Sequence, residues 1–316
     1  MRGSVNMKTM IGPYGSAALN NAALFKDIHA DTAWFHGFDE WAFEECARHG
    51  IQACVEFATF RADYEKFPHL VPIGVDDKPI RYGNRLQGIC LSKTDFLDEI
   101  DNKLKIGLST YSPMGIWLDY MTYGGWFEDP NPDLQDSCFC AECINHFNHA
   151  TNIDETIPQR ILANHHKAWV NHKCQRIADF TSHYTSIIRK MCPDAVIGIY
   201  MCPYTPEAYD GALSRIFAQD YALLASFVDV FTPLIYCTKS GRDASWSRSF
   251  LESSTDFIPE DKPVQLILDF MDFPGSLEQT VLSSVRSRGV QMFSGVEIFK
   301  DKASMEIFAK CVDRFR

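Results

Sequence analysis

The sequence predicts a single (β/α)8 barrel that spans all 316 residues. Short, nearly continuous apolar runs alternate with amphipathic stretches along almost the whole chain, which is typical of a parallel sheet buried on both faces. Eight such runs occur, and eight β/α units close naturally into a barrel. No glycine-rich phosphate loop follows the first run, so an open doubly wound sheet is disfavoured.

We expect the first strand at residues 32–36, after an N-terminal lead-in of residues 1–28. A helix that ends at His49-Gly50, a favourable C-cap, precedes the second strand. A long helical region covers residues 158–191, and a final helix runs to the C-terminus. The remaining strands are expected at 51–57, 86–91, 115–120, 195–201, 228–236, 263–270 and 290–299.

Two predicted connections are too long to be simple turns. One covers residues 58–85 after the second strand, and the other covers residues 121 to about 158 after the fourth. Both leave the carboxyl ends of strands, which is the face on which barrel enzymes build their sites. We therefore expect these two loops to shape the functional site.

Composition limits the classes of partner. The net charge is -11 and no basic run is present, so nucleic acid is an unexpected partner. No apolar run approaches the length of a membrane span. Residues 1–4 (MRGS) lack the apolar stretch of a signal peptide and resemble a cloning remnant, with Met7 as the natural start. Eleven cysteines without an export signal suggest a reduced, cytoplasmic protein, and the oligomeric state stays open.

Acidic residues end several of the predicted apolar strands. These residues are Glu56, Asp119, Asp269 and Glu297. A buried carboxylate is costly unless it is paired or used in chemistry. Two carboxyl groups that converge on one pocket, one an acid and the other a base or nucleophile, are what glycosidic cleavage requires. Pairing with arginine or helix capping is the alternative for any one of these groups.

Aromatic residues gather at the same ends of the strands and are candidates for substrate binding, because sugar rings stack on aromatic faces. They are Tyr120, Tyr123, Trp126, Tyr200, Tyr204 and Tyr236.

A cysteine cluster predicts a metal site. Cys138, Cys140 and Cys143 place three thiols within six residues, a spacing that suits a soft tetrahedral ion such as zinc. Cys90, at the end of the predicted third strand, is the candidate for the fourth ligand. A site closed by four thiolates would be structural. Free reduced thiols or a disulfide are the alternatives, and the other cysteines are expected in the core.

Residues 50–147 resemble the catalytic barrel of glycoside hydrolase family 42, the zinc-containing β-galactosidases. The resemblance rests on residues 67–72 (FPHLVP) and 80–85 (IRYGNR), and on Cys90, the Cys-x-Cys-x-x-Cys run from Cys138 to Cys143, and Phe147. It implies a zinc ion on the same four cysteines. Arg81, which lies in this stretch, is expected to contact substrate.

The sequence also departs from that family. The family ends its fourth strand with Asn-Glu, the Glu being the general acid, whereas this strand ends Asp119-Tyr120. The family nucleophile is a Glu at the end of strand seven, and Asp269 holds that place. Strands four, six and seven are similar to those of a looser set of glycosidase-like barrels with Gly-Ile-x-x-Asp-Tyr, Thr-Pro-x-x-Tyr and Gln-x-x-x-Asp-Phe.

These observations together predict a glycoside hydrolase that acts on a small glycoside or oligosaccharide. Asp119 and Asp269 are expected to be the main carboxylates, with Glu297 as a further acid and Glu56 in substrate binding. A carbohydrate-binding barrel without activity is the first alternative. A lyase or deacetylase on the same barrel is the second, and it would need an open metal site.

Overall fold

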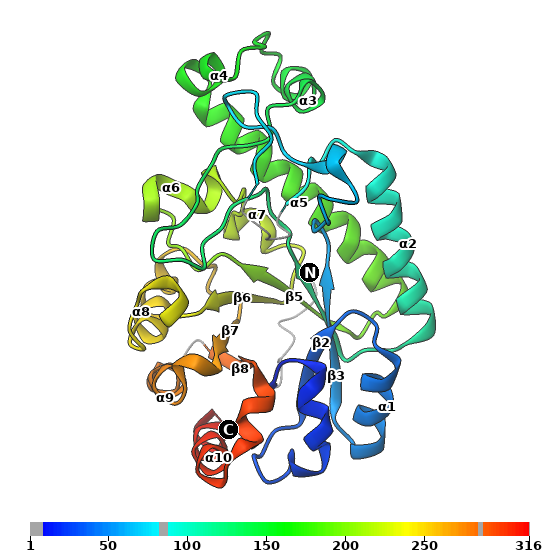
Figure 1. The fold of residues 1–316 in the computed structure, drawn as a ribbon, viewed down its shortest axis with the longest axis vertical. Helices are drawn as coiled ribbons and strands as arrows, with labels where there is room; N and C mark the ends of the chain where they lie inside the picture. Colours follow the sequence, from blue (N-terminus) through cyan, green and yellow to red (C-terminus); the bar gives the residue numbers. More distant parts are fainter. Residues whose placement is uncertain (1–8, 82–87, 284–286, 316) are drawn as a thin grey trace.

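The computed structural model describes residues 9–81, 88–283 and 287–315. The described strands form one eight-stranded parallel sheet in the order β1-β8-β7-β6-β5-β4-β3-β2 (Figure 1). A parallel bridge between Tyr14 and Trp34 joins the β1 edge to the β2 edge, so the sheet is nearly closed into the predicted barrel. The strands are β1 (Met10–Pro13), β2 (Thr32–His36), β3 (Gln52–Ala58), β4 (Gly115–Asp119), β5 (Val196–Met201), β6 (Val230–Ile235), β7 (Val264–Asp269) and β8 (Ser287–Phe293).

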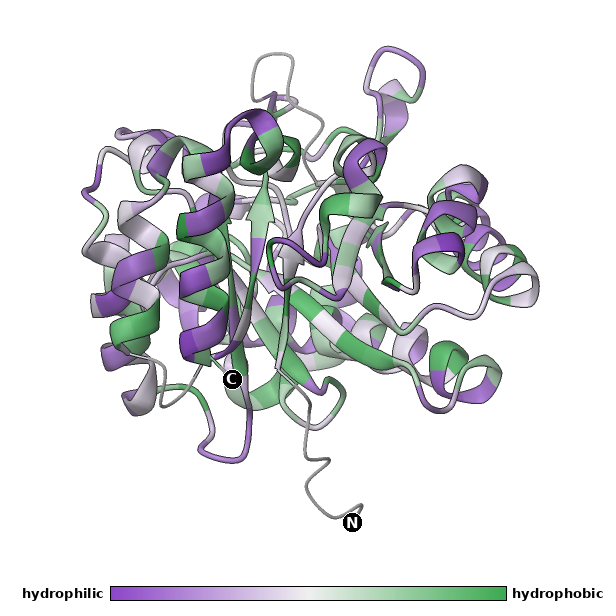
Figure 2. Cartoon of the chain, turned by 90° about the horizontal axis from the view of Figure 1, so that it is seen from below, coloured by the Kyte–Doolittle hydropathy of each residue, from purple (hydrophilic) through white to green (hydrophobic). Residues whose placement is uncertain are grey.

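Helices surround this sheet and face it with their apolar sides, while their hydrophilic sides point outward (Figure 2). The α-helices are α1 (Glu40–His49), α2 (Thr94–Thr110), α3 (Ala141–Thr151), α4 (Pro158–Asn164), α5 (His166–Met191), α6 (Ala208–Arg215), α7 (Tyr221–Leu224), α8 (Trp246–Ser253), α9 (Gly275–Leu282) and α10 (Lys302–Phe315). Short 3-10 helices are η1 (Ser16–Leu24), η2 (Pro68–Leu70), η3 (Thr238–Ser240), η4 (Ser254–Asp256), η5 (Phe270–Asp272) and η6 (Gly295–Lys300). No helix in these described ranges is long and apolar enough to cross a membrane.

Alternation along each strand separates the barrel interior from the outer core. In β4, Trp117 points into the barrel, whereas Ile116 and Leu118 pack against the helices. A side chain on Gly198 of β5 would come within 2.2 Å of the Trp117 ring, so this glycine makes room for the indole. Because the period is two, the next inward position on β4 is Asp119, at the carboxyl end of the strand.

The first strand of the barrel is β1, and this corrects the prediction for residues 1–28. Met10–Pro13 pairs with Gly289 to Met292 of β8 and is part of the barrel, not of a lead-in. Its Gly12 and Pro13 are weak strand formers, so its sequence gives little β signal. A side chain on Gly12 would clash with the Thr32 carbonyl oxygen at 1.8 Å, which explains why glycine is needed there.

The strand predicted at 86–91 was wrong: residues 88–91 form no strand, and residues 86–87 lie outside the described part. This run is apolar because Ile89, Cys90 and Leu91 are buried in the loop that follows β3. In the described part of the chain, that loop therefore includes residues 59–81 and 88–93. The loop after β4 runs from residue 120 to α3, and both rise with α3 and α4 at the top of the view (Figure 1).

Candidate active site and cysteine cluster

Two acids, the buried Glu56 and the half-buried Asp119, lie side by side at the carboxyl ends of β3 and β4. Glu56 and Asp119 both occupy inward positions, and a side-chain hydrogen bond joins them. Burial raises the pKa of Glu56 well above its usual range, and the adjacent Asp119 charge raises it further. Burial also raises the pKa of Asp119, to about 6. The pair therefore holds a proton near neutral pH, because two hydrogen-bonded carboxyl groups in a buried site do not both ionise.

His36, at the end of β2, lies beside this pair. Its Nδ1 is 2.9 Å from Glu56 Oε1, and the Tyr14 hydroxyl lies 3.2 Å from the imidazole nitrogens. Burial and the Arg61 charge lower the pKa of His36, which favours a neutral ring that donates Nδ1–H to Glu56. The same Arg61 charge partly opposes the rise in pKa of both acids.

The backbone is strained directly after Asp119. Tyr120 has a φ of 56°, a left-handed conformation that costs about 1–3 kcal/mol in a non-glycine residue. The Asp119 side chain accepts a hydrogen bond from the Tyr120 amide at 2.8 Å, and the Thr59 hydroxyl donates to the Asp119 carbonyl at 2.6 Å. Arg61 lies over the Tyr120 ring, 5.4 Å from its centroid. These contacts fix the Asp119 carboxyl at the strand end.

A third acid, Asp269, ends β7 and is also buried. Its Oδ2 lies 2.9 Å from Lys239 Nζ, which also lies 3.5 Å from Glu128 Oε2. The ammonium group sits over the rings of Tyr236, at 4.4 Å, and Phe293, at 4.7 Å. Lys239 is thus surrounded by two carboxylates and two aromatic faces, which attract its positive charge.

A cavity of about 50 Å³ opens at this face of the barrel. Burial is the main cause that raises the pKa of Tyr236. Four negative charges raise it further, those of Glu128, Asp119, Asp269 and Glu56. The four carboxyl groups therefore lie around one tyrosine. Residues that line the cavity are Asp119, Tyr120, Thr122, Phe127, Glu128, Tyr200, Cys202, Phe217, Gln219 and Leu234.

The structure thus brings together several residues that the sequence singled out. Glu56, Asp119 and Asp269 converge with Tyr236, and Tyr120 and Tyr200 line the cavity.

The other predicted residues lie differently. The strand that was expected to carry Glu297 ends at Phe293, so Glu297 lies in η6, where its half-exposed side chain pairs with Lys300. Arg81 is exposed, with Glu65 and the Tyr64 ring as its described partners. Tyr123 is buried against Lys173. Trp126 donates to the Glu128 carbonyl oxygen at 3.3 Å.

Sequence reasoning missed His36, Arg61, Glu128 and Lys239. His36 had a usable signal, because it is two residues after the inward Trp34 on the same strand. The other three lie in loops, where no periodicity marks the direction of a side chain.

Four cysteines meet where the two long loops touch. The sulfur atoms of Cys90, Cys138, Cys140 and Cys143 all lie within 4.8 Å of one another, so this group could hold a metal ion. Cys90 Sγ is 3.5 Å from Cys140 Sγ and 3.7 Å from Cys143 Sγ. The Ile73 amide donates to Cys138 Sγ at 3.3 Å. None of these side chains is in a disulfide.

A small apolar core supports the cysteine cluster. It consists of Phe139, just before α3, and of residues from α3, α4 and α5, and the Phe139 ring stacks on Trp169 at 4.8 Å. The loop after β3 joins this unit: the Phe139 amide donates to the Ile73 carbonyl oxygen at 2.8 Å. The Gln159 amide side chain donates to the Val75 carbonyl oxygen, also at 2.8 Å. The cluster therefore links both loops above the barrel.

The comparisons with known proteins agree with a (β/α)8 barrel. No family model matches the sequence, and no curated protein matches it. The glycoside hydrolase domain of PgaB (BpsB) from Bordetella bronchiseptica superposes with a TM-score of 0.71 at 12% identity, covering 96% of this chain and 98% of that one. At this identity the likeness establishes the fold.

Two β-galactosidases superpose nearly as well. That of the haloarchaeon Halorubrum lacusprofundi gives a TM-score of 0.67 at 12% identity, with 97% of this chain and 58% of that chain covered. Gan42B, a GH42 β-galactosidase from G. stearothermophilus, gives 0.66 at 12% identity, with 98% and 56% covered. The chain thus spans less than two thirds of the length of these enzymes. The protein shares its barrel architecture with glycoside hydrolases.

Proposed function

We propose that this protein is a glycoside hydrolase that cleaves a small glycoside or an oligosaccharide. The observation that carries the proposal is the convergence of acids from three strands around one tyrosine: Glu56, Asp119 and Asp269 with Tyr236. The likeness to glycoside hydrolase barrels supports it at the level of the fold.

Asp119 is the proposed general acid. Because its pKa is raised to about 6, about half of its carboxyl groups carry a proton at pH 6 and about a tenth at pH 7, whereas an ordinary aspartate carries almost none; protonation of a leaving oxygen requires this proton. Glu56 lies beside it and shares that proton, and His36 orients Glu56 from the far side. Glu56 and His36 therefore act through Asp119 as positioning residues.

Asp269 is the proposed second carboxylate. It ends β7 beside the Lys239 ammonium, and a carboxylate at this strand end is suited to activate water or to attack the anomeric carbon. A separation of about 5 Å between the two carboxyl groups gives retention of configuration, and one of about 6.5–9.5 Å leaves room for water and gives inversion. Tyr120, Tyr200 and Tyr236 would hold the sugar through ring faces and hydroxyl groups.

We further propose that the cysteine cluster binds zinc. A tetrahedral ion with zinc–sulfur bonds of about 2.3 Å places its ligands about 3.8 Å apart, close to the 3.5 and 3.7 Å found between Cys90 and two of its partners. Zinc bound by all four thiolates would have no open position, so it would be structural and would fasten the two loops. Among the described residues, this is the one group of three or more metal-binding side chains within reach of a single ion.

A second candidate function is carbohydrate binding without hydrolysis. The ion pair between Asp269 and Lys239 favours it, because a carboxylate that stays paired is not free to react. In this case the tyrosine-lined cavity would bind sugar and Asp269 would only position Lys239. The two candidates differ in whether bond cleavage depends on Asp119 and Asp269.

The test is hydrolysis of a panel of aryl glycosides by wild type, Asp119→Asn and Asp269→Asn, with zinc content measured on the same samples. Asp98→Asn, on the exposed face of α2, is the matched control. We expect wild type and the control to hydrolyse at least one glycoside, both site variants to lose more than about 100-fold in rate, and all four to hold about one zinc per chain. The anomer of the first product, read by ¹H NMR, assigns retention or inversion.

Equal rates in all four proteins would refute the assigned roles. No hydrolysis by wild type, with sugars still raising its melting temperature, would favour the binding barrel. Absence of zinc would refute the metal assignment whatever the activity.

A further inference from the structure

Three consecutive residues in the first half of α6, Tyr209 to Gly211, have left-handed backbone conformations. Their φ and ψ angles are 50° and 48° at Tyr209, 56° and 47° at Asp210, and 72° and 28° at Gly211. Only the third is a glycine, for which this conformation is unstrained. Each of the other two costs about 1–3 kcal/mol, so the surroundings must hold this turn in place.

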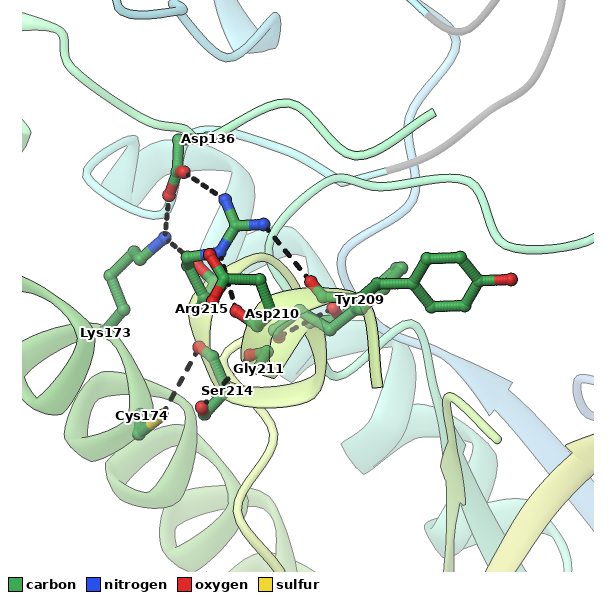
Figure 3. Close-up of polar contacts among 10 residues, drawn as sticks. Asp136, Lys173, Cys174, Tyr209, Asp210, Gly211, Ser214 and Arg215 are labelled. Carbon is green, nitrogen blue, oxygen red and sulfur yellow. Dashed lines mark hydrogen bonds and ion pairs between the residues drawn. The ribbon is translucent and has the colours of Figure 1, made fainter. Parts of the chain in front are cut away.

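Arg215 supplies that support (Figure 3). Its Nε donates to the Asp210 carbonyl oxygen at 3.1 Å, and another guanidinium nitrogen donates to the Tyr209 carbonyl oxygen at 3.4 Å. The third nitrogen donates to Asp136 Oδ2 at 2.8 Å. Arg215 thus joins two carbonyl groups of the strained turn to a carboxylate in the loop after β4.

Lys173 contacts both Asp136 and Arg215 and so holds them in place. Its Nζ lies 3.3 Å from Asp136 Oδ1 and donates to the Arg215 carbonyl oxygen at 2.5 Å. The lysine is fully buried, and its ammonium group lies over the rings of Tyr123, at 5.4 Å, and Trp169, at 5.9 Å. A buried ammonium with this many partners gives a rigid support, because each partner would be left unpaired if another moved.

The turn presents the Tyr209 side chain to solvent. Its ring points away from the network in Figure 3, and the residue is 40% exposed. One face lies against Tyr204, with ring centroids 4.7 Å apart. Tyr204 in turn contacts Phe127 and Phe217, both of which line the cavity. A continuous row of aromatic rings therefore runs from the wall of the candidate active site to Tyr209 at the surface.

We propose that Tyr209 is the stacking platform of an outer subsite, which binds a second sugar ring of an oligosaccharide whose first ring enters the cavity. This inference rests on the proposed function and deepens it, because it assigns the substrate class to chains rather than single sugars. An exposed aromatic face suits the C–H face of a pyranose. The Tyr204 hydroxyl is buried and has no hydrogen-bond partner among the described residues, so it offers a polar group within the same row. Strain held by a dedicated network is a mark of functional sites.

The test measures binding in the Asp119→Asn background, so that bound sugar is not cleaved. The probes are three β-1,4-linked tetrasaccharides, one of glucose, one of galactose and one of N-acetylglucosamine. Each is compared with the methyl glycoside of the same single sugar, and binding is measured by titration calorimetry. We expect Tyr209→Ala to weaken tetrasaccharide binding by about 3- to 10-fold and to change monosaccharide binding less than twofold. Tyr209→Phe should bind as the parent does, since it keeps the ring.

Two further variants separate stacking from loss of fold. Trp41→Ala removes an equally exposed aromatic residue on α1 and should leave tetrasaccharide affinity unchanged. Asp210→Gly relieves strain but keeps Tyr209, so it should raise the melting temperature and retain affinity. Equal tetrasaccharide affinity in the parent and Tyr209→Ala, or no binding of any of the three tetrasaccharides by the parent, would overturn the proposal. Binding that depends on Tyr209 in a protein that hydrolyses no glycoside would support the subsite and refute the hydrolase.

Discussion

Ionisation of Asp119 should cost the folded protein stability, and replacement of this residue should therefore stabilise it. Burial raises the pKa of Asp119 from 3.8 to about 6, a shift of about two units and hence about 3 kcal/mol in unfolding free energy once the group is ionised. Because the folded-state pKa lies above the unfolded one, the folded state binds more protons between these values. The contribution of Asp119 to stability is then greatest below its unfolded-state pKa of 3.8 and is lost as the pH rises through about 6. The hydrogen-bonded Glu56, whose pKa is also raised, acts in the same direction.

Asp119→Asn keeps the shape of the protonated acid and removes this penalty. We expect the stability advantage of the variant over wild type to grow by about 2 kcal/mol between pH 4.5 and pH 7.5. The measurement is urea denaturation followed by tryptophan fluorescence at both pH values. Asp98→Asn, exposed on α2, is the control and should show no such growth. An advantage that does not change with pH, or a variant less stable than wild type at pH 7.5, would refute the assignment of a raised pKa to Asp119.

Three other outcomes follow from the same structure. Hydrolysis should decline as the pH rises above about 6, because Asp119 loses the proton that the leaving group needs; a pH–rate profile that stays level to pH 8 would contradict its role as the acid. Removal of metal with a chelator, or Cys140→Ser, should lower the melting temperature and speed proteolysis in the loops after β3 and β4; cleavage elsewhere first would contradict the clamp. Lys173→Met should destabilise the protein by about 3 kcal/mol or more in urea denaturation, because it leaves Asp136 buried with one cation instead of two; a change below 1 kcal/mol would mean that Arg215 alone suffices.

The barrel could be predicted because its strands carry a strong local signal. β4 to β7 are short apolar runs between amphipathic helices, and these features depend on neighbours in the sequence. β1 and residues 88–91 show where such reasoning fails. Met10–Pro13 becomes a strand through pairing with β8, far away in the chain, whereas Ile89 to Leu91 are apolar because loops bury them. Burial and strand formation produce the same apolar pattern, and a single sequence does not separate them.

The acids of the candidate site could be predicted from the sequence, but their pairing partners could not. Glu56, Asp119 and Asp269 each come two residues after an inward apolar side chain, so strand periodicity places them in the barrel. Which acids touch is a different question. The hydrogen-bonded pair is Glu56 with Asp119, on adjacent strands, while Asp269 pairs with Lys239 from a loop. These pairings depend on side-chain directions in loops, for which the sequence has no periodic signal.

The loop after β4 connects the cavity, the lysine–arginine network and the cysteine cluster, so these parts of the face are held in place together. It leaves the barrel at the strained Tyr120, carries Glu128 into the cavity, passes Asp136 in the lysine–arginine network and ends at the cysteine cluster beside α3. Each anchor fixes a different partner: Asp136 holds α5 and α6, and the cysteines hold the loop after β3. The strands supply the acids of the candidate site, but the position of Glu128 and of the Tyr209 turn depends on these anchors. Loosening an anchor should therefore alter substrate affinity before it unfolds the barrel, because the acids themselves rest on strands whose pairing the loop does not touch.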